Sequence, residues 1–175
     1  MKAGPARQQV RRFVLRTVLL VGEGDAEVAF IEHLKALYIT RGCGLAVTIK
    51  NARGKGALHV VDVAVRQSRN AAFDVRAVLL DTDTGWNDKT QSIARKAKVQ
   101  VVPCHPCLEA MLLALHGETA QGKSSAHHKQ TFANRFGTQA HDASVYARHF
   151  SFELLEKARS GSPELERLLA LLKPV

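Results

Sequence analysis

The stretch VRAVLLDTDTGWND, residues 75–88, is an apolar run that ends abruptly in two aspartates placed two positions apart. Its aliphatic side chains are typical of a strand that is buried on both faces of a parallel sheet. Asp81 and Asp83 repel each other at the strand end unless a cation, a proton or a turn hydrogen bond relieves them. The stretch therefore predicts a central strand that brings two carboxylates to one edge of a sheet.

Strand and helix patterns alternate on both sides of this stretch. We expect further strands over residues 13–21, 45–51 and 99–103, and helices over residues 57–69, 89–98 and 107–116. Another helix is expected to start after a cap at Asp25 and to run to about Tyr38. Four such strand–helix units predict an α/β fold, in which a parallel sheet carries helices on both faces.

The last third of the chain has a different character. Residues 117–141 are polar and are expected to form a loop, whereas residues 145–159 and 164–172 have the pattern of two helices. The second of these helices starts at Ser162-Pro163, because proline is favoured in a first helical turn. The predicted organisation is a basic arm (1–16), an α/β core (17–117), and a loop with C-terminal helices packed on that core (118–175).

Composition limits the classes of partner. The chain has 175 residues with 25 Lys and Arg against 16 Asp and Glu, a net charge of +9. This excess favours a polyanion, usually nucleic acid, although a basic protein without such a partner is the alternative.

No apolar run approaches the roughly 20 residues of a membrane span. Three cysteines argue against a secreted disulfide framework, so we expect a cytoplasmic protein of bacterial type.

Acidic side chains follow three of the four expected strands. Glu23 and Glu27 follow the first strand, Asp81 and Asp83 the third, and Glu109 the fourth. Because parallel strands end at one edge of the sheet, we expect these carboxylates to gather there. Such a cluster is costly unless a cation compensates it, and Mg²⁺ or Mn²⁺ prefers oxygen ligands. We expect Glu23, Asp81 and Asp83 to hold the ion, with Glu27 and Glu109 completing the acidic shell or binding a second ion.

Each of these acids also has a purely structural interpretation. Asp81 can form a turn and Asp83 can cap the next helix. Glu27 and Glu109 suit the first turn of a helix, where the dipole favours negative charge. Glu23 is harder to explain in this way, because its flanking glycines permit a tight turn and the close approach of a ligand.

Basic residues near the same edge are candidates for binding phosphate. Arg53 and Lys55 lie in the loop ARGKG after the second strand, and His105 lies beside Pro106. Guanidinium, ammonium and loop N–H groups together can hold a phosphate. The segment HHKQTFANRFG, residues 127–137, mixes basic and aromatic side chains and can bind a nucleic-acid strand. We favour the alternative, a solvated loop whose two phenylalanines are buried in the core.

Three segments resemble the Toprim superfamily, found in topoisomerases, bacterial primases and OLD-family nucleases. They are VLLVGEGDAEVAFIEHL (18–34), VLLDTD (78–83) and PCHPCLEAMLLALHG (103–117). The first and last are similar to segments of the RloB-like family, which is associated with phage defence. The resemblance departs from the family pattern at Asp25, Ala26, His105 and Met111, and none of these departures removes a carboxylate.

This resemblance implies a Rossmann-like Toprim sheet and Mg²⁺-dependent hydrolysis of phosphodiesters in DNA or RNA. It implies that Asp81 and Asp83 bind the metal and that Glu23 is a metal ligand or general acid–base. Glu27 and Glu109 match further catalytic acids of the family. A homodimer or a partner protein from the same locus is also expected. The alternative is a module of Toprim descent that binds nucleic acid or a nucleotide without cutting it.

Two other patterns compete with the Toprim interpretation. Cys104 and Cys107 form a CxxC between a strand and a helix, which is also the context of thioredoxin-like redox motifs. A second alternative is a zinc site formed by these two cysteines with His127 and His128. We favour buried, unreactive cysteines. The segment VLLDTDTG also resembles the first motif of haloacid-dehalogenase-type phosphatases, but Gly85 stands where that family has Thr or Val.

Overall fold

The computed structural model describes residues 14–119 and 122–174. Our expectations for residues 1–13, a basic arm and the start of the first strand, lie outside these ranges. Strands and helices alternate along the first part of the chain, in the order β1 (Arg16–Gly22), α1 (Asp25–Tyr38), β2 (Leu45–Asn51), α2 (Ala57–Asn70), β3 (Val75–Asp81), α3 (Asp88–Lys96), β4 (Gln100–Cys104) and α4 (Leu108–Leu115). Four more helices follow: α5 (Ser125–Phe136), α6 (Ala143–His149), α7 (Phe152–Arg159) and α8 (Pro163–Leu171).

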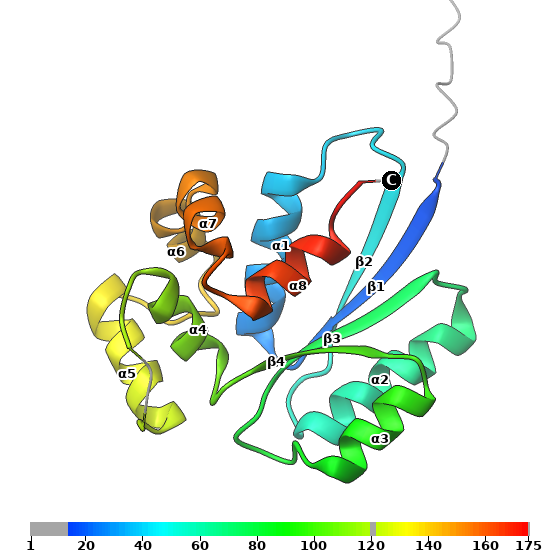
Figure 1. The fold of residues 1–175 in the computed structure, drawn as a ribbon, viewed down its shortest axis with the longest axis horizontal. Helices are drawn as coiled ribbons and strands as arrows, with labels where there is room; N and C mark the ends of the chain where they lie inside the picture. The colour runs from blue at the N-terminus through cyan, green and yellow to red at the C-terminus, as the bar shows by residue number, and fades with distance from the viewer. Residues whose placement is uncertain (1–13, 120–121, 175) are drawn as a thin grey trace, which may run out of the picture.

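The four strands form one parallel sheet in the order β2-β1-β3-β4 (Figure 1). The apolar strand β3 is central, as its sequence predicts. Gly22, the last residue of β1, is in register with Asn51 of β2 and Leu79 of β3. Asp81 is in register with Cys104 of β4. The register therefore places the ends of all four strands at one edge of the sheet.

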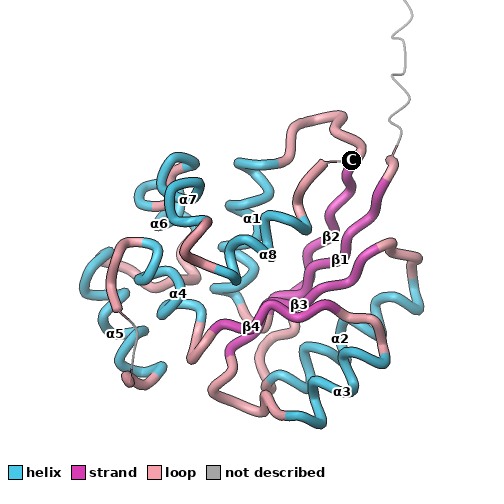
Figure 2. The backbone as a smooth tube through the Cα atoms, in the orientation of Figure 1, coloured by secondary structure: helices cyan, strands magenta, loops and turns pink. Residues whose placement is uncertain are grey.

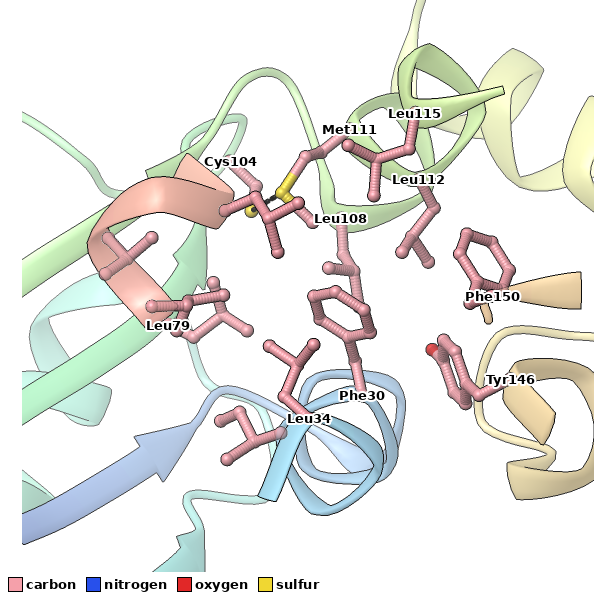
Figure 3. Close-up of a cluster of buried hydrophobic side chains, with 14 of the residues drawn as sticks. Phe30, Leu34, Leu79, Cys104, Leu108, Met111, Leu112, Leu115, Tyr146 and Phe150 are labelled. Carbon is pink, nitrogen blue, oxygen red and sulfur yellow. Dashed lines mark hydrogen bonds between the residues drawn. The ribbon is translucent and has the colours of Figure 1, made fainter. Parts of the chain in front are cut away.

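The sheet is covered on both faces, which confirms the predicted α/β layers (Figure 2). Alternate strand residues point to opposite faces, so Leu19 and Val21 pack with α2 and α3. Val18 and Leu20 face a second and larger cluster. That larger cluster includes residues of α1, α4 and the C-terminal helices, and Figure 3 shows its centre around Phe30, Leu108 and Tyr146.

The C-terminal helices share the core of the sheet. Leu165 and Leu168 of α8 and Leu155 of α7 are fully buried in the same cluster as the strand residues. Tyr146 of α6 donates hydrogen bonds to the carbonyls of Ala140, at 2.7 Å, and Ala26, at 3.3 Å. The second bond ties α6 to the first turn of α1. Within the described residues, no helix has both the length and the apolar character needed to cross a bilayer.

The prediction of a loop over residues 117–141 was wrong, because this segment contains α5. Ser124 caps the helix by accepting a hydrogen bond from the His127 N–H, and Gly137 ends it with a φ of 73°. His128, Phe132 and Phe136 recur every fourth residue and are buried. This spacing gives the segment one apolar face, so it forms a helix even though most of its residues are polar. Burial of the two phenylalanines confirms one half of the favoured alternative for residues 127–137, whereas the solvated loop that it assumed is a helix.

The single helix expected over residues 145–159 is divided into α6 and α7. Phe150 leaves the helical conformation, with φ and ψ of −123° and 64°, and its ring is fully buried. Its carbonyl lies 2.7 Å from the ring nitrogen Nε2 of His33 in α1. Ser151 then caps α7 by accepting a hydrogen bond from the Leu154 N–H. A serine cap after a buried aromatic anchor explains the break.

Candidate functional site

Glu23 links the ends of the two central strands. It follows β1 directly, and its backbone N–H donates to the carbonyl of Leu79 in β3 at 3.0 Å. Its carboxylate atom Oε2 accepts a hydrogen bond from the Asp81 N–H, also at 3.0 Å. Burial raises the pKa of Glu23 despite this bond, and the charge of Asp83 raises it further. Glu23 therefore lies at the ends of β1 and β3, where the charge of Asp83 acts on its carboxylate.

Glu27 lies in the first turn of α1 and holds the start of that helix. Its Oε2 accepts a hydrogen bond from the Gly24 N–H at 2.7 Å, and its side chain is buried. A Cβ on Gly22 would lie 2.9 Å from the Cβ of Glu27, so glycine permits this close approach. Burial raises the pKa of Glu27 to about 7, and the charges of Glu109 and Glu23 add to the effect.

The structure corrects the predicted role of Asp25. Gly24 is the N-cap of α1, and Asp25 is the first residue of the helix. The Oδ1 atom of Asp25 accepts a hydrogen bond from the Asn51 side-chain amide at 2.6 Å. Asp25 therefore joins α1 to the end of β2, and the capping interaction comes from Glu27 instead.

Asp81 is the most constrained of the acids. Its Oδ1 accepts a hydrogen bond from the Leu108 N–H at 2.9 Å, so it satisfies a free donor at the start of α4. Its Oδ2 lies 3.9 Å from the ammonium of Lys129. Burial raises the pKa of Asp81 to about 8, with further contributions from the charges of Glu27 and Glu109. Together they raise the pKa of Asp81 more than the Leu108 N–H and the ammonium of Lys129 lower it.

Glu109 and Asp83 complete the group but differ in exposure. The Glu109 side chain is buried, and its Oε2 has no hydrogen-bond partner among the described residues. Its charge acts on both Glu27 and Asp81. Asp83 is exposed, and its backbone N–H donates to the Pro106 carbonyl at 3.3 Å. We call these five residues the acidic cluster: Glu23, Glu27, Asp81, Asp83 and Glu109.

Lys129 is the residue at this site that the sequence interpretation missed. It lies on α5, in the segment predicted as a loop, and it contacts Asp81 from more than 40 positions away in sequence. The fields of Glu109 and Asp81 raise its pKa against the opposing effect of its partial burial. The spacing of His128, Phe132 and Phe136 could have predicted the helix, but no local pattern indicates that Lys129 faces Asp81.

The three predicted phosphate-binding residues are exposed and lie at different distances from the cluster. The Arg53 N–H donates to Asn51 Oδ1 at 2.7 Å, and the next N–H, from Gly54, donates to the Glu23 carbonyl at 2.7 Å. The loop is thus attached to the Glu23 backbone. Arg53 lines a small hollow of about 500 Å³ beside α1 with Gly24 and Asp25.

Lys55 and His105 are less directly connected to the carboxylates. Lys55 lies in the same loop with a φ of 74°, and it makes no hydrogen bond or ion pair with the acidic cluster in the part of the chain described. The Nδ1 atom of His105 lies 2.9 Å from the hydroxyl of Thr82, between the two aspartates. His105 is therefore positioned at the turn after β3.

The cysteines fit the favoured interpretation of buried thiols. Cys104 and Cys107 are fully buried, and neither forms a disulfide. Burial raises the pKa of the Cys104 thiol, and it raises that of Cys107 to about 12. Reactive thiols need a lowered pKa and exposure. Within residues 14–119 and 122–174, no three His, Cys, Asp or Glu side chains are placed to hold a metal ion, and this includes the zinc set considered above.

Comparison with known proteins gives no match. No protein-family model fits the chain, and neither a curated protein nor a solved structure is significantly similar to it. The geometry of the acidic cluster therefore carries the functional proposal.

Proposed function

We propose that the acidic cluster binds Mg²⁺ or Mn²⁺ and that the chain hydrolyses phosphodiester bonds in DNA or RNA. The observation that carries this proposal is the free-energy cost of burying several carboxylates close to one another. Asp81 and Glu27 have pKa values raised to about 8 and about 7, chiefly because both carboxyl groups are buried and also because further carboxylates lie near them. Buried like charges persist only where something compensates them, and a divalent cation is a common compensator.

The donor atoms fit a hard divalent ion. All the candidate ligands are carboxylate oxygens, which Mg²⁺ and Mn²⁺ prefer. The hydrogen bonds of Glu23 and Glu27 engage Oε2 in each case, and the buried Oε2 of Glu109 has no partner within the described residues. Ion binding requires these side chains to rotate toward one another, since no ready three-ligand arrangement exists among the described residues.

Each residue of the site has a distinct task in this proposal. When bound, the ion would supply charge neutralisation for the phosphodiester and a lowered pKa for the attacking water. Glu23, whose pKa is raised and whose orientation is fixed by the Asp81 N–H, would accept the proton of that water. Arg53 and Lys129 would contact phosphate oxygens. His105 would orient the turn that carries Asp83 through its contact with Thr82.

The Toprim and RloB-like resemblance supports the same reaction. Its acidic positions, Glu23, Asp81 and Asp83, lie at or just after the ends of the two central strands in the structure. A net charge of +9 would attract a polyanionic substrate and concentrate it at the protein surface. The family assignment and a role in phage defence remain part of this proposal, as do a cytoplasmic location and a homodimer or a partner from the same locus.

A second candidate is a module that binds nucleic acid or a nucleotide without cleaving it. Two observations favour it, and the first is that no three side chains in the described part of the chain are placed to bind a metal ion. Lys129 also partly neutralises Asp81 without any added ion. In that case the acidic cluster would have a structural role, in which its carboxylates hold the starts of α1 and α4 through hydrogen bonds to backbone N–H groups.

Cleavage assays separate the two candidates. Single-stranded and duplex DNA and RNA are incubated with the protein and Mn²⁺ or Mg²⁺, and products are resolved on denaturing gels. The nuclease proposal predicts cleavage that is lost on addition of EDTA and reduced at least a hundredfold by Asp83→Ala. Asp83 is exposed, so this variant is expected to fold. Asp62→Ala, on the exposed side of α2, is the matched control and should cleave normally.

Binding of oligonucleotides without cleavage under any of these metal conditions would support the module instead. Cleavage that survives in Asp83→Ala and in Asp81→Asn would place the activity elsewhere, and a co-purifying nuclease would then explain it. Circular dichroism of each variant, compared with the wild type, separates loss of activity from loss of fold.

A further inference from the structure

A cavity of about 620 Å³ lies between α4, α7 and the start of α8. Figure 1 shows α7 and the connection to α8 beside α4, on the side of the sheet that α1 also covers. Its volume is in the range of small-molecule sites, which are usually apolar clefts with a few polar groups. The acidic cluster supplies no lining residue, and of the candidate site residues described above only His105 lines the cavity.

The floor of the cavity is aliphatic. Met111, Ala114 and Leu115 line it from one side of α4, and Leu154 and Ala158 line it from α7. The small alanine side chains in the lining leave space for a flat group. A thioether and aliphatic carbons together form a surface that suits the face of a planar ring.

The lining also carries two opposite charges that form no ion pair with each other. Lys157 of α7 is exposed, and Glu164 lies in the first turn of α8. Neither forms an ion pair within the described ranges of the chain. Glu164 accepts one long hydrogen bond, at 3.4 Å, from the Ser162 hydroxyl, and the exposed Ser160 offers another hydroxyl. A ligand can therefore meet a cation and a carboxylate in the same cavity.

His105 connects the cavity to the turn after β3. Its imidazole lines the cavity wall, and its Nδ1 atom lies 2.9 Å from the Thr82 hydroxyl. Its Nε2 atom has no hydrogen-bond partner among the described residues. The same side chain therefore contacts both the cavity and Thr82, the residue between Asp81 and Asp83.

We propose that this cavity binds a nucleoside 5′-phosphate unit, either as a free nucleotide or as one unstacked nucleotide of a strand. The base would lie on the aliphatic floor, with Glu164 accepting a hydrogen bond from its ring N–H or amino group. Lys157 and His105 would contact the phosphate. Few common metabolites combine a flat apolar body, N–H donors and an anion in this way, and a nucleotide has all three.

This proposal does not depend on phosphodiester hydrolysis and is tested without metal. Isothermal titration calorimetry in EDTA measures binding of AMP, GMP, CMP and UMP, with inorganic phosphate as the comparison. We expect one site per chain and at least tenfold tighter binding of one or more nucleotides than of phosphate. Ala114→Trp fills the floor from an exposed helix position and should weaken this binding at least tenfold, as should Lys157→Ala.

Matched controls separate the cavity from general surface effects. Ala170→Trp alters an exposed alanine of α8 that does not line the cavity, and Lys96→Ala removes an exposed lysine from α3. Both variants should bind nucleotides like the wild type. A five-nucleotide single strand, titrated in the same way, distinguishes the source: tighter binding than any mononucleotide indicates a strand, and equal or weaker binding indicates a free nucleotide.

Three results would overturn the proposal. The first is the lack of saturable binding of all four nucleotides, and the second is equal affinity for inorganic phosphate, which would indicate a simple anion site. The third is binding that persists unchanged in both Ala114→Trp and Lys157→Ala, which would place the nucleotide elsewhere on the protein. None of these results bears on metal-dependent cleavage, which is measured separately.

Discussion

The carboxylate of Glu23 accepts a hydrogen bond from the backbone N–H of Asp81 at 3.0 Å, across 58 positions of sequence. This bond joins the residues that follow β1 and end β3, so the two central strands deliver their acids to one place. Asp81 in turn holds the N–H of Leu108 at the start of α4. The same carboxylates that are proposed to bind an ion therefore also hold the backbone of the site in position.

The raised pKa values predict that stability falls as pH rises through neutrality. In the unfolded chain Asp81 and Glu27 lose their protons near pH 4, whereas in the folded chain they do so near pH 8 and 7. Between these limits the folded state binds more protons, so the free energy of unfolding decreases with pH. We expect a decrease of about 2–4 kcal/mol between pH 5.5 and 8.5 in EDTA, at roughly 1.4 kcal/mol per pKa unit with allowance for solvent screening.

Urea denaturation across this pH range measures the effect. Asp81→Asn keeps an oxygen acceptor for the Leu108 N–H but removes the titrating group, so its stability should depend less on pH. A wild-type profile that is flat, or that rises with pH, would show that the two acids are not held in the environment described here.

Glu109→Gln should have opposite effects on stability and on ion binding. The Glu109 charge raises the pKa of both Glu27 and Asp81, so its removal should stabilise the metal-free protein at pH 8 by about 1 kcal/mol. The same change removes a proposed ligand and should weaken Mn²⁺ binding at least tenfold. Thermal unfolding with and without Mn²⁺ measures both, and Glu32→Gln, on the exposed side of α1, is the control. A loss of stability in EDTA would contradict the repulsion.

Lys129→Met should tighten the binding of Mn²⁺. The ammonium of Lys129 lies 3.9 Å from Asp81 and repels any other cation at that carboxylate. Replacing it with an uncharged side chain of similar length removes the repulsion, and an increase in affinity of about threefold to tenfold is expected. Calorimetry with Mn²⁺ provides the measurement, with Lys96→Met on α3 as a control. Weaker Mn²⁺ binding in Lys129→Met would mean that Lys129 supports the cation site instead of competing with it.

Gly22→Ala should destabilise the protein and displace the start of α1. An added Cβ would lie 2.9 Å from the Glu27 Cβ and 3.0 Å from the Val28 backbone nitrogen, both of which are held by the helix. Overpacking of this kind costs about 1–3 kcal/mol. Gly161→Ala is the comparison, because its Cβ would meet only the Ala158 carbonyl at 3.6 Å. Equal stabilities of the two variants in urea denaturation would show that the approach of α1 to β1 is looser than described.

The α/β layers could be predicted from the sequence because they depend on local patterns. Alternate residues of β1 point to opposite faces, and the apolar run of β3 indicates a central strand before any contact is known. The gathering of Glu23, Asp81 and Glu109 could be predicted for a similar reason, since parallel strands end at one edge. These features require only periodicity and topology.

The remaining features depend on tertiary contacts or on weaker local signals. The helix α5 was missed because its polar composition hid the spacing of Phe132 and Phe136, which a periodicity count would have detected. Lys129 could not be assigned to Asp81, since the packing of α5 against α4 decides where it points. The capping contact of Glu27 with Gly24 required the actual conformation of the turn after β1.

The most direct test of the central claim is a calorimetric titration of the metal-free protein with Mn²⁺ at pH 7, in which the ion must displace the protons of Asp81 and Glu27. We expect saturable binding of one or two ions per chain, proton release that varies with the ionisation enthalpy of the buffer, and a loss of affinity of at least tenfold in Asp81→Asn. Asp62→Asn should bind like the wild type. The lack of saturable binding, or equal affinity in Asp81→Asn, would contradict the assignment of the acidic cluster as a cation site.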